Sequence, residues 1–339
     1  MATKLSFPPI SDYPFKHQRN PKSFQSISPF SLIPTNYYYN YYGSNPNFKN
    51  VCSIKSPPPV IRAVKQDVIQ STDSESTLES NFPSASSSKL VLVVGGSGGV
   101  GQIVVASLLN RDIKIRLLVR DPEKATKLFC EHDEEKLQVC KGDTRSQENL
   151  DPSVLEGVTH VICCTGTTAF PSRRWDGDNT PERVDWDGVR NLISILPSSV
   201  KRFVLVSSVG VTKFNELPWS VMNLFGVLKY KKMGEDFLRD SGIPYTIIRP
   251  GRLTDGPYTS YDLNTLLKAT AGERRAVLMG QGDKLVGEAS RLVVAEACIQ
   301  SLDIESTEGE IFEINSVQGD GPGSDPQQWR ELFDAARTK

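Results

Sequence analysis

The sequence predicts an α/β fold in which a doubly wound parallel sheet carries helices on both faces. Two observations lead to this prediction. Residues 90–94 are apolar and largely β-branched, as expected of a strand that is buried on both faces of a parallel sheet. Similar runs recur along the chain and alternate with helix-compatible stretches over about 230 residues, a pattern typical of right-handed strand–helix–strand crossovers.

The remaining elements are expected in alternation along the chain. Strands are predicted at 113–119, 137–140, 160–164, 203–206, 245–248 and, more weakly, 311–314. Helices are predicted at 100–109, 123–129, 183–196, 221–239 and 289–302. No second core and no internal repeat is visible, so residues 89–316 are predicted to form a single domain. A C-terminal tail at 317–339 is expected to hold one short helix within 325–339.

The first 63 residues differ in composition from the rest of the chain. Residues 1–50 contain five basic side chains, Lys4, Lys16, Arg19, Lys22 and Lys49, but one acidic side chain, Asp12. They are rich in serine, proline, asparagine and tyrosine, and they lack the apolar segment of a secretory signal. This composition predicts a disordered chloroplast transit peptide at 1–63, followed by a linker at 64–88. The alternative is a merely disordered tail.

Composition excludes several classes of protein. The formal net charge of −1 gives no electrostatic reason to expect nucleic acid as a partner. No run approaches the roughly 18 apolar residues that a membrane-spanning helix needs. The six cysteines are irregularly spaced, which predicts neither a disulfide scaffold nor a metal site.

A glycine-rich turn directly follows the first strand and precedes a helix. Glycines in this position allow the backbone to approach a pyrophosphate, and the helix N-terminus offers N–H groups and the positive end of the dipole. In this strand–turn–helix context the turn predicts a dinucleotide-binding site. The candidate phosphate-binding residues are Gly95, Ser97, Gly98, Gly99, Val100 and Gly101.

The end of the second strand predicts which dinucleotide is bound. Arg120 lies 19 residues after Gly101, where a site selective for NAD would present Asp or Glu to the ribose 2′-hydroxyl. A guanidinium suits the 2′-phosphate of NADP instead, and Lys124 adds a second positive charge one helical turn later. We therefore expect NADP(H) rather than NAD. The adjacent Asp121 leaves the alternative open.

The spacing Gly95, Gly98, Gly101 resembles that of atypical and extended short-chain dehydrogenase/reductases, particularly their NmrA-like and flavin-reductase-like members. The resemblance extends over nearly all of residues 89–316 and implies an NAD(P)-binding Rossmann fold. It also implies further cofactor contacts. These are Asp143 at the adenine, Thr165 and Gly166 after the fourth strand, Pro250 and Gly251 beside the nicotinamide, and Lys231 at the ribose.

The same resemblance implies an incomplete catalytic set. Ser208 matches the family's active-site serine and Lys231 its lysine, but the Tyr-x-x-x-Lys rule then requires a tyrosine where the chain has Val227. Tyr230 faces about 60° away from that position on a helix with 100° per residue. Without the phenol, ordinary ketone reduction lacks its proton donor.

Two functions remain open at this point. The first is an NADPH-dependent oxidoreductase of the chloroplast stroma whose acceptor is a quinone, a flavin or another conjugated small molecule. The second is a non-catalytic NADP(H)-binding sensor or assembly protein, peripherally associated with thylakoid or envelope complexes. The loop at 170–176 contains aromatic and cationic residues that would suit a planar, anionic acceptor, or it is an ordinary surface loop.

Overall fold

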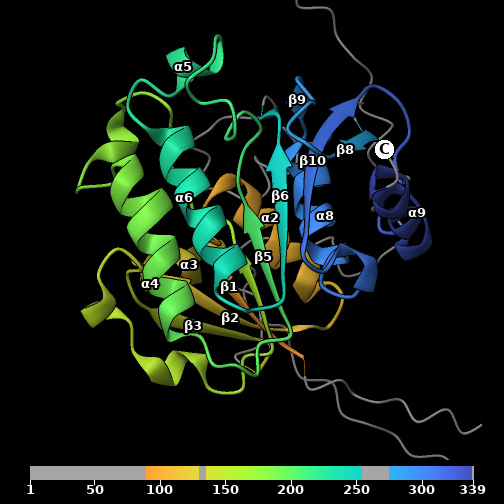
Figure 1. Cartoon of the computed structure of the whole chain (residues 1–339). Helices are drawn as coiled ribbons and strands as arrows, with labels where there is room; N and C mark the ends of the chain where they lie inside the picture. The colour runs from red at the N-terminus through yellow and green to blue at the C-terminus, as the bar shows by residue number, and fades with distance from the viewer. Residues whose placement is uncertain (1–88, 130–134, 254–274, 338–339) are drawn as a thin grey trace, which may run out of the picture. The chain divides into compact units, whose positions relative to one another are not determined.

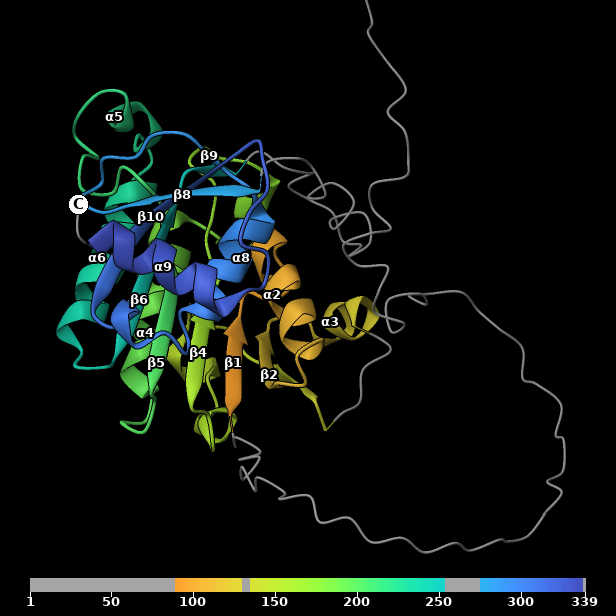
Figure 2. The same cartoon turned by 90° about the vertical axis from the view of Figure 1, so that its right-hand side faces the viewer.

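The computed structural model describes residues 89–129, 135–253 and 275–337. Within them, eight strands form one sheet in the order β3-β2-β1-β4-β5-β6-β10-β8 (Figures 1 and 2). All neighbouring strands are parallel except β8, which pairs antiparallel with β10. The strands are β1 (Leu90–Val94), β2 (Lys114–Val119), β3 (Leu137–Lys141), β4 (His160–Cys163), β5 (Arg202–Val206), β6 (Tyr245–Pro250), β8 (Ala276–Gly280) and β10 (Glu310–Val317). The predicted doubly wound α/β fold is confirmed.

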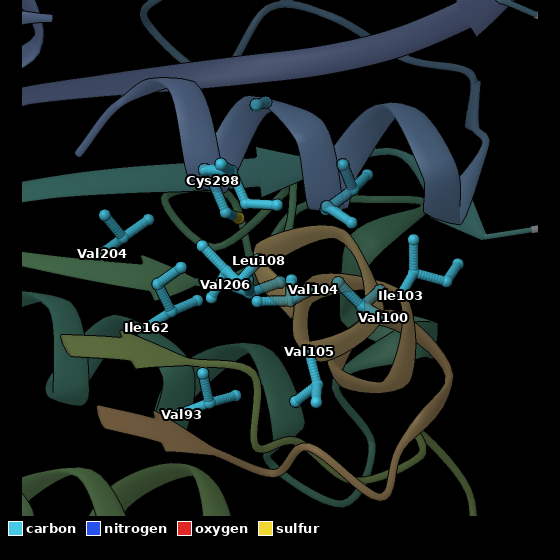
Figure 3. Packing of buried hydrophobic residues seen from close by; sticks show 14 of the residues in the cluster. Val93, Val100, Ile103, Val104, Val105, Leu108, Ile162, Val204, Val206 and Cys298 are labelled. Carbon is cyan, nitrogen blue, oxygen red and sulfur yellow. The ribbon is translucent and has the colours of Figure 1, made fainter. Parts of the chain in front are cut away.

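Helices cover both faces of this sheet. They are α2 (Gly99–Leu109), α3 (Pro122–Leu128), α4 (Gly188–Ile195), α5 (Trp219–Met222), α6 (Val227–Asp240), α8 (Arg291–Gln300) and α9 (Pro326–Arg337). Val91 and Val93 of β1 belong to a buried cluster with α2 and α8, whereas Leu92 and Val94 belong to a second cluster with α4 and α6. Burial on both faces explains why this strand is apolar throughout. Figure 3 shows the first cluster, in which valines of α2 meet Val93, Ile162, Val204 and Val206 of the strands.

The structure differs from the predicted elements at four places. The helix expected at 221–239 is two helices, α5 and α6, because Gly226 between them adopts a left-handed φ of +83°. The helix expected at 183–196 begins with the π-helical segment η5 (Glu182–Asp187) before α4. Strand β8 was not predicted. The short parallel pair β7 (Arg252–Leu253) and β9 (Glu288–Ala289) was not predicted either, and β9 takes the first residue of the helix expected at 289–302.

The C-terminal helix packs one face against the core. The helix expected within 325–339 is α9, whose Trp329 and Phe333 are buried. The ring centroids of Phe333 and Phe312 on β10 are 4.8 Å apart, and aromatic pairs of this kind add to the stabilisation from burial. The predicted leader and linker lie outside the described residues.

Short single-turn helices complete the connections. They are η2 (Gln147–Asn149), η3 (Pro152–Leu155), η4 (Arg173–Trp175) and η6 (Glu305–Thr307). In the part of the chain that the structure describes, no helix is long and apolar enough to cross a membrane.

His160 on β4 predicts a pH dependence of stability. Burial lowers its pKa from 6.5 to about 4, and the nearby Lys89 contributes in the same direction. As the pH falls, the unfolded chain therefore takes up this proton first. The stabilisation from neutral His160 is complete above pH 6.5 and decreases towards pH 4, by about 1.4 kcal/mol for each pH unit.

Urea unfolding at pH 7 and pH 5 measures this contribution. We expect His160→Gln to lose less free energy of unfolding between the two values than the unchanged chain does. Equal losses in both proteins would contradict the assignment, because the carboxylates that also titrate in this range are common to both.

Candidate functional site

The glycine-rich turn after β1 has the geometry that its sequence predicts. Gly95 has a left-handed φ of +81°, and the N–H of Gly98 donates to the carbonyl of Gly95 at 2.9 Å. A Cβ at Gly95 would lie 2.9 Å from the backbone of Thr165, and one at Gly101 would lie 2.7 Å from Gly96 Cα. Both contacts are with backbone that has no room to move, so this turn requires glycine at 95 and 101.

A cavity of about 370 Å³ opens beside this turn, at the carboxyl ends of β1, β2, β3 and β4. Loops at this edge of an open α/β sheet form the binding crevice of such folds. Most of the predicted cofactor residues line it, namely Gly95, Ser97, Gly98, Gly99, Arg120, Lys124, Asp143, Thr165 and Gly166. Val100, Gly101, Ser208, Lys231, Pro250 and Gly251 are not among its lining residues.

The cavity wall is strongly cationic. Five basic side chains line it, and Asp143 is the one carboxylate among the described lining residues. The five are Arg120, Lys124, Arg145, Arg173 and Arg174. Partial burial lowers the pKa of Lys124, and the neighbouring Arg120 and Arg174 lower it further against the opposing effect of Asp121. Such a concentration of positive charge favours a phosphate-bearing ligand.

Arg120 is held in place by its neighbours. Its guanidinium donates to Asn179 Oδ1, and Arg145 Nη1 donates to the same oxygen at 3.0 Å. Burial lowers the pKa of Arg120, as does the charge of Arg145, while Asp143 acts in the opposite direction. The side chain is therefore oriented before any ligand arrives, which reduces the entropy lost on binding.

Asp143 has a partner within the protein. Its carboxylate accepts hydrogen bonds from the backbone N–H of Arg145 at 3.0 Å and from its guanidinium, at 3.0 Å from Nε to Oδ1 and 2.6 Å from Nη2 to Oδ2. Burial raises the pKa of Asp143, but the bonds from Arg145 outweigh it and the pKa lies below its ordinary value. The side chain for which the family resemblance implies an adenine contact is therefore ionised and already paired with Arg145.

Asp121 has a structural role. Its Oδ1 accepts from the N–H of Lys124 at 3.0 Å and so caps the N-terminus of α3, followed by Pro122 in the first turn. Asp121 does not line the cavity, whereas Arg120 and Lys124 on either side of it do.

Lys231 lies in a second, smaller cavity. Its ammonium forms an ion pair with Asp185 of η5 at 2.8 Å, and the two side chains are 13% and 1% exposed. Burial raises the pKa of Asp185, against the opposing effect of Lys231. The small cavity, about 10 Å³, is lined by Thr165, Asp185, Val189, Leu205, Val206, Ser207 and Lys231.

Ser207, rather than Ser208, shares this cavity with Lys231. Ser207 is buried, and its Oγ has no hydrogen-bond partner among the described residues. Ser208 Oγ donates to the carbonyl of Val209 at 3.0 Å and lines neither cavity. The predicted pair Ser208 and Lys231 is therefore not brought together in either cavity.

The position of the expected tyrosine is filled by apolar packing. Val227 is buried with Val211 and Leu228, and Trp219 packs against them. Tyr230, three residues on, is half-buried on α6, and burial and the nearby Glu182 raise its pKa. Neither residue lines either cavity, so the residues that the structure describes place no phenol beside Lys231.

The remaining predicted residues lie deeper in the fold. Pro250 ends β6, and the N–H of Gly251 donates to the carbonyl of Ile314 on β10 at 3.0 Å. A Cβ at Gly251 would lie 2.5 Å from the carbonyl oxygen of Gly287. Glycine is required here by packing against neighbouring backbone.

The loop after β4 contributes to the cavity through its arginines. Arg173 and Arg174 of η4 line the same wall as Arg120, while the ring of Trp175 packs edge-on against Phe225, with 5.7 Å between centroids. The cationic part of this loop thus belongs to the phosphate side of the cavity.

Besides Ser207, the site residues Arg145, Asn179 and Asp185 were not predicted from the sequence. Arg145 lies two residues after Asp143, so its pairing with that carboxylate was detectable as a local contact. Asn179 and Asp185 gave no such signal, because each partner is distant in the chain, 59 residues for Asn179 and Arg120 and 46 for Asp185 and Lys231.

Comparison with known proteins agrees with this geometry. A family model described as NAD(P)H-binding matches residues 95–305. The chain is 32% identical over 268 residues to the uncharacterized chloroplastic protein At2g37660 of Arabidopsis thaliana, covering 74% of this chain and 76% of that one. It is 31% identical over 293 residues to sanguinarine reductase of Eschscholzia californica, covering 75% and 98%. It is 31% identical over 230 residues to the photosystem II assembly factor Ycf39 of Trieres chinensis, covering 68% and 64%.

Two further matches bear on architecture. The chloroplastic protein TIC 62 of Arabidopsis thaliana is 33% identical over 231 residues, but the match covers only 33% of that longer protein. Among solved structures, the oxidoreductase ylbE of Lactococcus lactis superposes with a TM-score of 0.54 at 18% identity, covering 74% of this chain and 97% of that one. At this identity the likeness is one of fold.

Proposed function

Because the chain belongs to the NAD(P)H-binding family of atypical short-chain dehydrogenase/reductases, we propose that it is an NADPH-dependent reductase of the chloroplast stroma. The observation that carries the proposal is the cationic wall beside the glycine-rich turn. The acceptor we propose is a conjugated small molecule such as a quinone or a flavin.

The residues present fit a dinucleotide. The turn leaves no room for a Cβ at Gly95 or Gly101, and it opens on a cavity at the N-terminus of α2. NADPH supplies a hydride when bound, and the protein's part is to hold and orient it. We assign the pyrophosphate to residues 95–101 and the nicotinamide ribose to Lys231.

The preference for NADP(H) over NAD is supported by the side chains around Arg120. Arg120, Lys124 and Arg174 carry the positive charge that a 2′-phosphate requires. Asp121, the carboxylate next to Arg120 in the sequence, caps α3 and does not line the cavity. A charge-assisted hydrogen bond of this kind contributes about 1.5–3 kcal/mol, which corresponds to roughly 10- to 150-fold in affinity.

A reductase is supported by sanguinarine reductase, whose length the chain covers almost completely. Among residues 89–129, 135–253 and 275–337 no tyrosine lines the cavity that holds Lys231, which favours an acceptor that takes its proton from water or from another group. A stromal location is supported by the acid-poor leader and by relatives named as chloroplastic. Peripheral association with a thylakoid or envelope complex is compatible with this location.

The second candidate is a non-catalytic NADP(H)-binding assembly or sensor protein. Val227, packed in an apolar cluster where the family's tyrosine is expected, favours it. The resemblance to an assembly factor supports it as well.

Binding and turnover measured on the full chain test both candidates. Calorimetry is expected to give a dissociation constant for NADPH at least about tenfold lower than that for NADH. The chain is then incubated with NADPH and a panel of quinones, flavins and conjugated enones. Oxidation of NADPH supports the reductase, whereas tight binding without oxidation by any member of the panel supports the second candidate. No heat with either dinucleotide would overturn both, and equal affinities would overturn the NADP preference.

A further inference from the structure

A buried polar cluster lies behind the wall of the main cavity. It consists of Asp185, Lys231 and Ser207, which come from η5, α6 and the end of β5. The Lys231 ammonium and the Asp185 carboxylate are 2.8 Å apart. A buried ion pair is weak evidence for stability, because removing both charges from water costs about as much as their attraction returns. Stability alone therefore does not explain why this ion pair is buried here.

Gly166 is where this cluster meets the main cavity. A Cβ at Gly166 would lie 3.1 Å from Lys231 Nζ and 3.5 Å from Asp185 Oδ1. Gly166 itself lines the main cavity, and Thr165 lines both cavities. The ammonium thus lies directly behind a residue that has no side chain to cover it.

Asp185 is held firmly enough to determine where the ammonium lies. Its Oδ2 accepts from the N–H of Thr167 at 3.3 Å, which ties it to the strand end that carries Gly166. Its backbone approaches α6 closely, since a Cβ at Gly234 would lie 2.9 Å from the carbonyl oxygen of Asp185. The carboxylate is 1% exposed and so is shielded from competing water.

The cluster retains capacity for further hydrogen bonds. An ammonium has three N–H donors, and although Lys231 forms an ion pair with Asp185, the Oδ1 of that carboxylate has no hydrogen-bond partner among the described residues. The buried hydroxyl of Ser207 has no partner among the described residues, and a hydroxyl both donates and accepts. These groups suit a ligand with neighbouring hydroxyls, such as a ribose.

We propose that Asp185 is a positioning residue, which holds the Lys231 ammonium at Gly166 so that the chain grips the nicotinamide half of the dinucleotide and not its adenosine half. The inference rests on the proposed binding of NADPH. Asp185 does not itself touch the ligand. Ser207 acts beside Lys231 in the same cluster.

Two ligands separate this role from a purely structural one. NADPH contains the nicotinamide ribose, whereas 2′,5′-ADP carries the 2′-phosphate but lacks the nicotinamide half. With the full chain, Asp185→Asn and Lys231→Met are each expected to lower the affinity for NADPH by about 10-fold or more. Each is expected to change the affinity for 2′,5′-ADP by no more than about 2-fold. Because the two residues act as one unit, the double variant is expected to bind NADPH no more weakly than the single variant that has the lower affinity.

A matched pair on the same helix provides the control. Lys232 and Asp236 also form an ion pair on α6, at 2.5 Å, but neither lines a cavity. The changes Lys232→Met and Asp236→Asn are expected to leave both affinities unchanged.

The outcomes are distinct. If Asp185→Asn leaves the affinity for NADPH unchanged, or if it lowers the affinities for 2′,5′-ADP and NADPH equally, the positioning role is wrong. If the unchanged chain binds neither ligand, the proposed function itself fails. Should either single variant fail to fold, the double variant leaves no lone buried charge, and Ser207→Ala provides a milder change with the same expected selectivity for NADPH.

Discussion

Replacing Arg120 with aspartate is expected to lower the affinity of the chain for NADPH about 100-fold or more and to leave the affinity for NADH nearly unchanged. Two effects combine: the charge-assisted bonds to the 2′-phosphate are lost, and a carboxylate is placed against a dianion. NADH lacks this phosphate, and its ribose hydroxyl is a good donor to the new carboxylate. The preference of the chain for NADPH over NADH is therefore expected to disappear or reverse.

Lys114→Asp is the matched control for this change. Lys114 is exposed at the opposite end of the same strand, and the substitution alters the net charge by the same amount. Calorimetric titration of both variants with both dinucleotides provides the measurement. If Lys114→Asp lowers the affinity for NADPH as much as Arg120→Asp does, the effect comes from the overall charge. The assignment of Arg120 to the 2′-phosphate is then wrong.

The largest effect on stability is expected at Glu235. Its carboxylate accepts from the guanidinium of Arg249, at 3.0 Å from Nε and 2.5 Å from Nη2, and both side chains are at least 95% buried. This pair joins α6 to β6. Glu235→Gln removes one charge and leaves the other in the interior, which typically costs about 3–5 kcal/mol. The negative charges of Asp283 and Glu313 near Arg249 favour the lower end of that range.

Urea unfolding of the full chain measures this loss. Asp236→Asn, on the exposed face of the same helix, is expected to change the free energy of unfolding by no more than about 0.5 kcal/mol. The double variant Glu235→Leu/Arg249→Met is expected to recover most of the loss, because it leaves no buried charge. A loss of less than about 1 kcal/mol in Glu235→Gln would contradict the importance of the pair.

The local features of the site were predictable from short stretches of sequence. An apolar run, a glycine-rich turn and a helix follow one another within 20 residues, and together they produce the phosphate-binding geometry at Gly95 and Gly101. Arg120 and Lys124 were predictable for the same reason, since their distance from the turn is set by one helix and one strand.

Contacts between distant segments were not predictable in this way. Ser207, and not the predicted Ser208, lines the small cavity. Adjacent residues of an extended chain point to opposite sides, so this choice depends on which side of the chain faces inward after β5. Strand β8 was missed although Ala276–Met279 is apolar, because so short an apolar run does not by itself distinguish a strand from other structure.

The sequence alone determined the α/β class, the order of its parallel strands along the chain and the place where a dinucleotide's phosphates are expected, because hydrophobic period and glycine turns act over a few residues. Tertiary structure alone decided that Asn179 orients Arg120, that Asp185 meets Lys231 and that Val227 lies in an apolar cluster. Each of these depends on crossovers or loops that bring separate segments to one place, and neither residue spacing nor composition encodes where those segments meet.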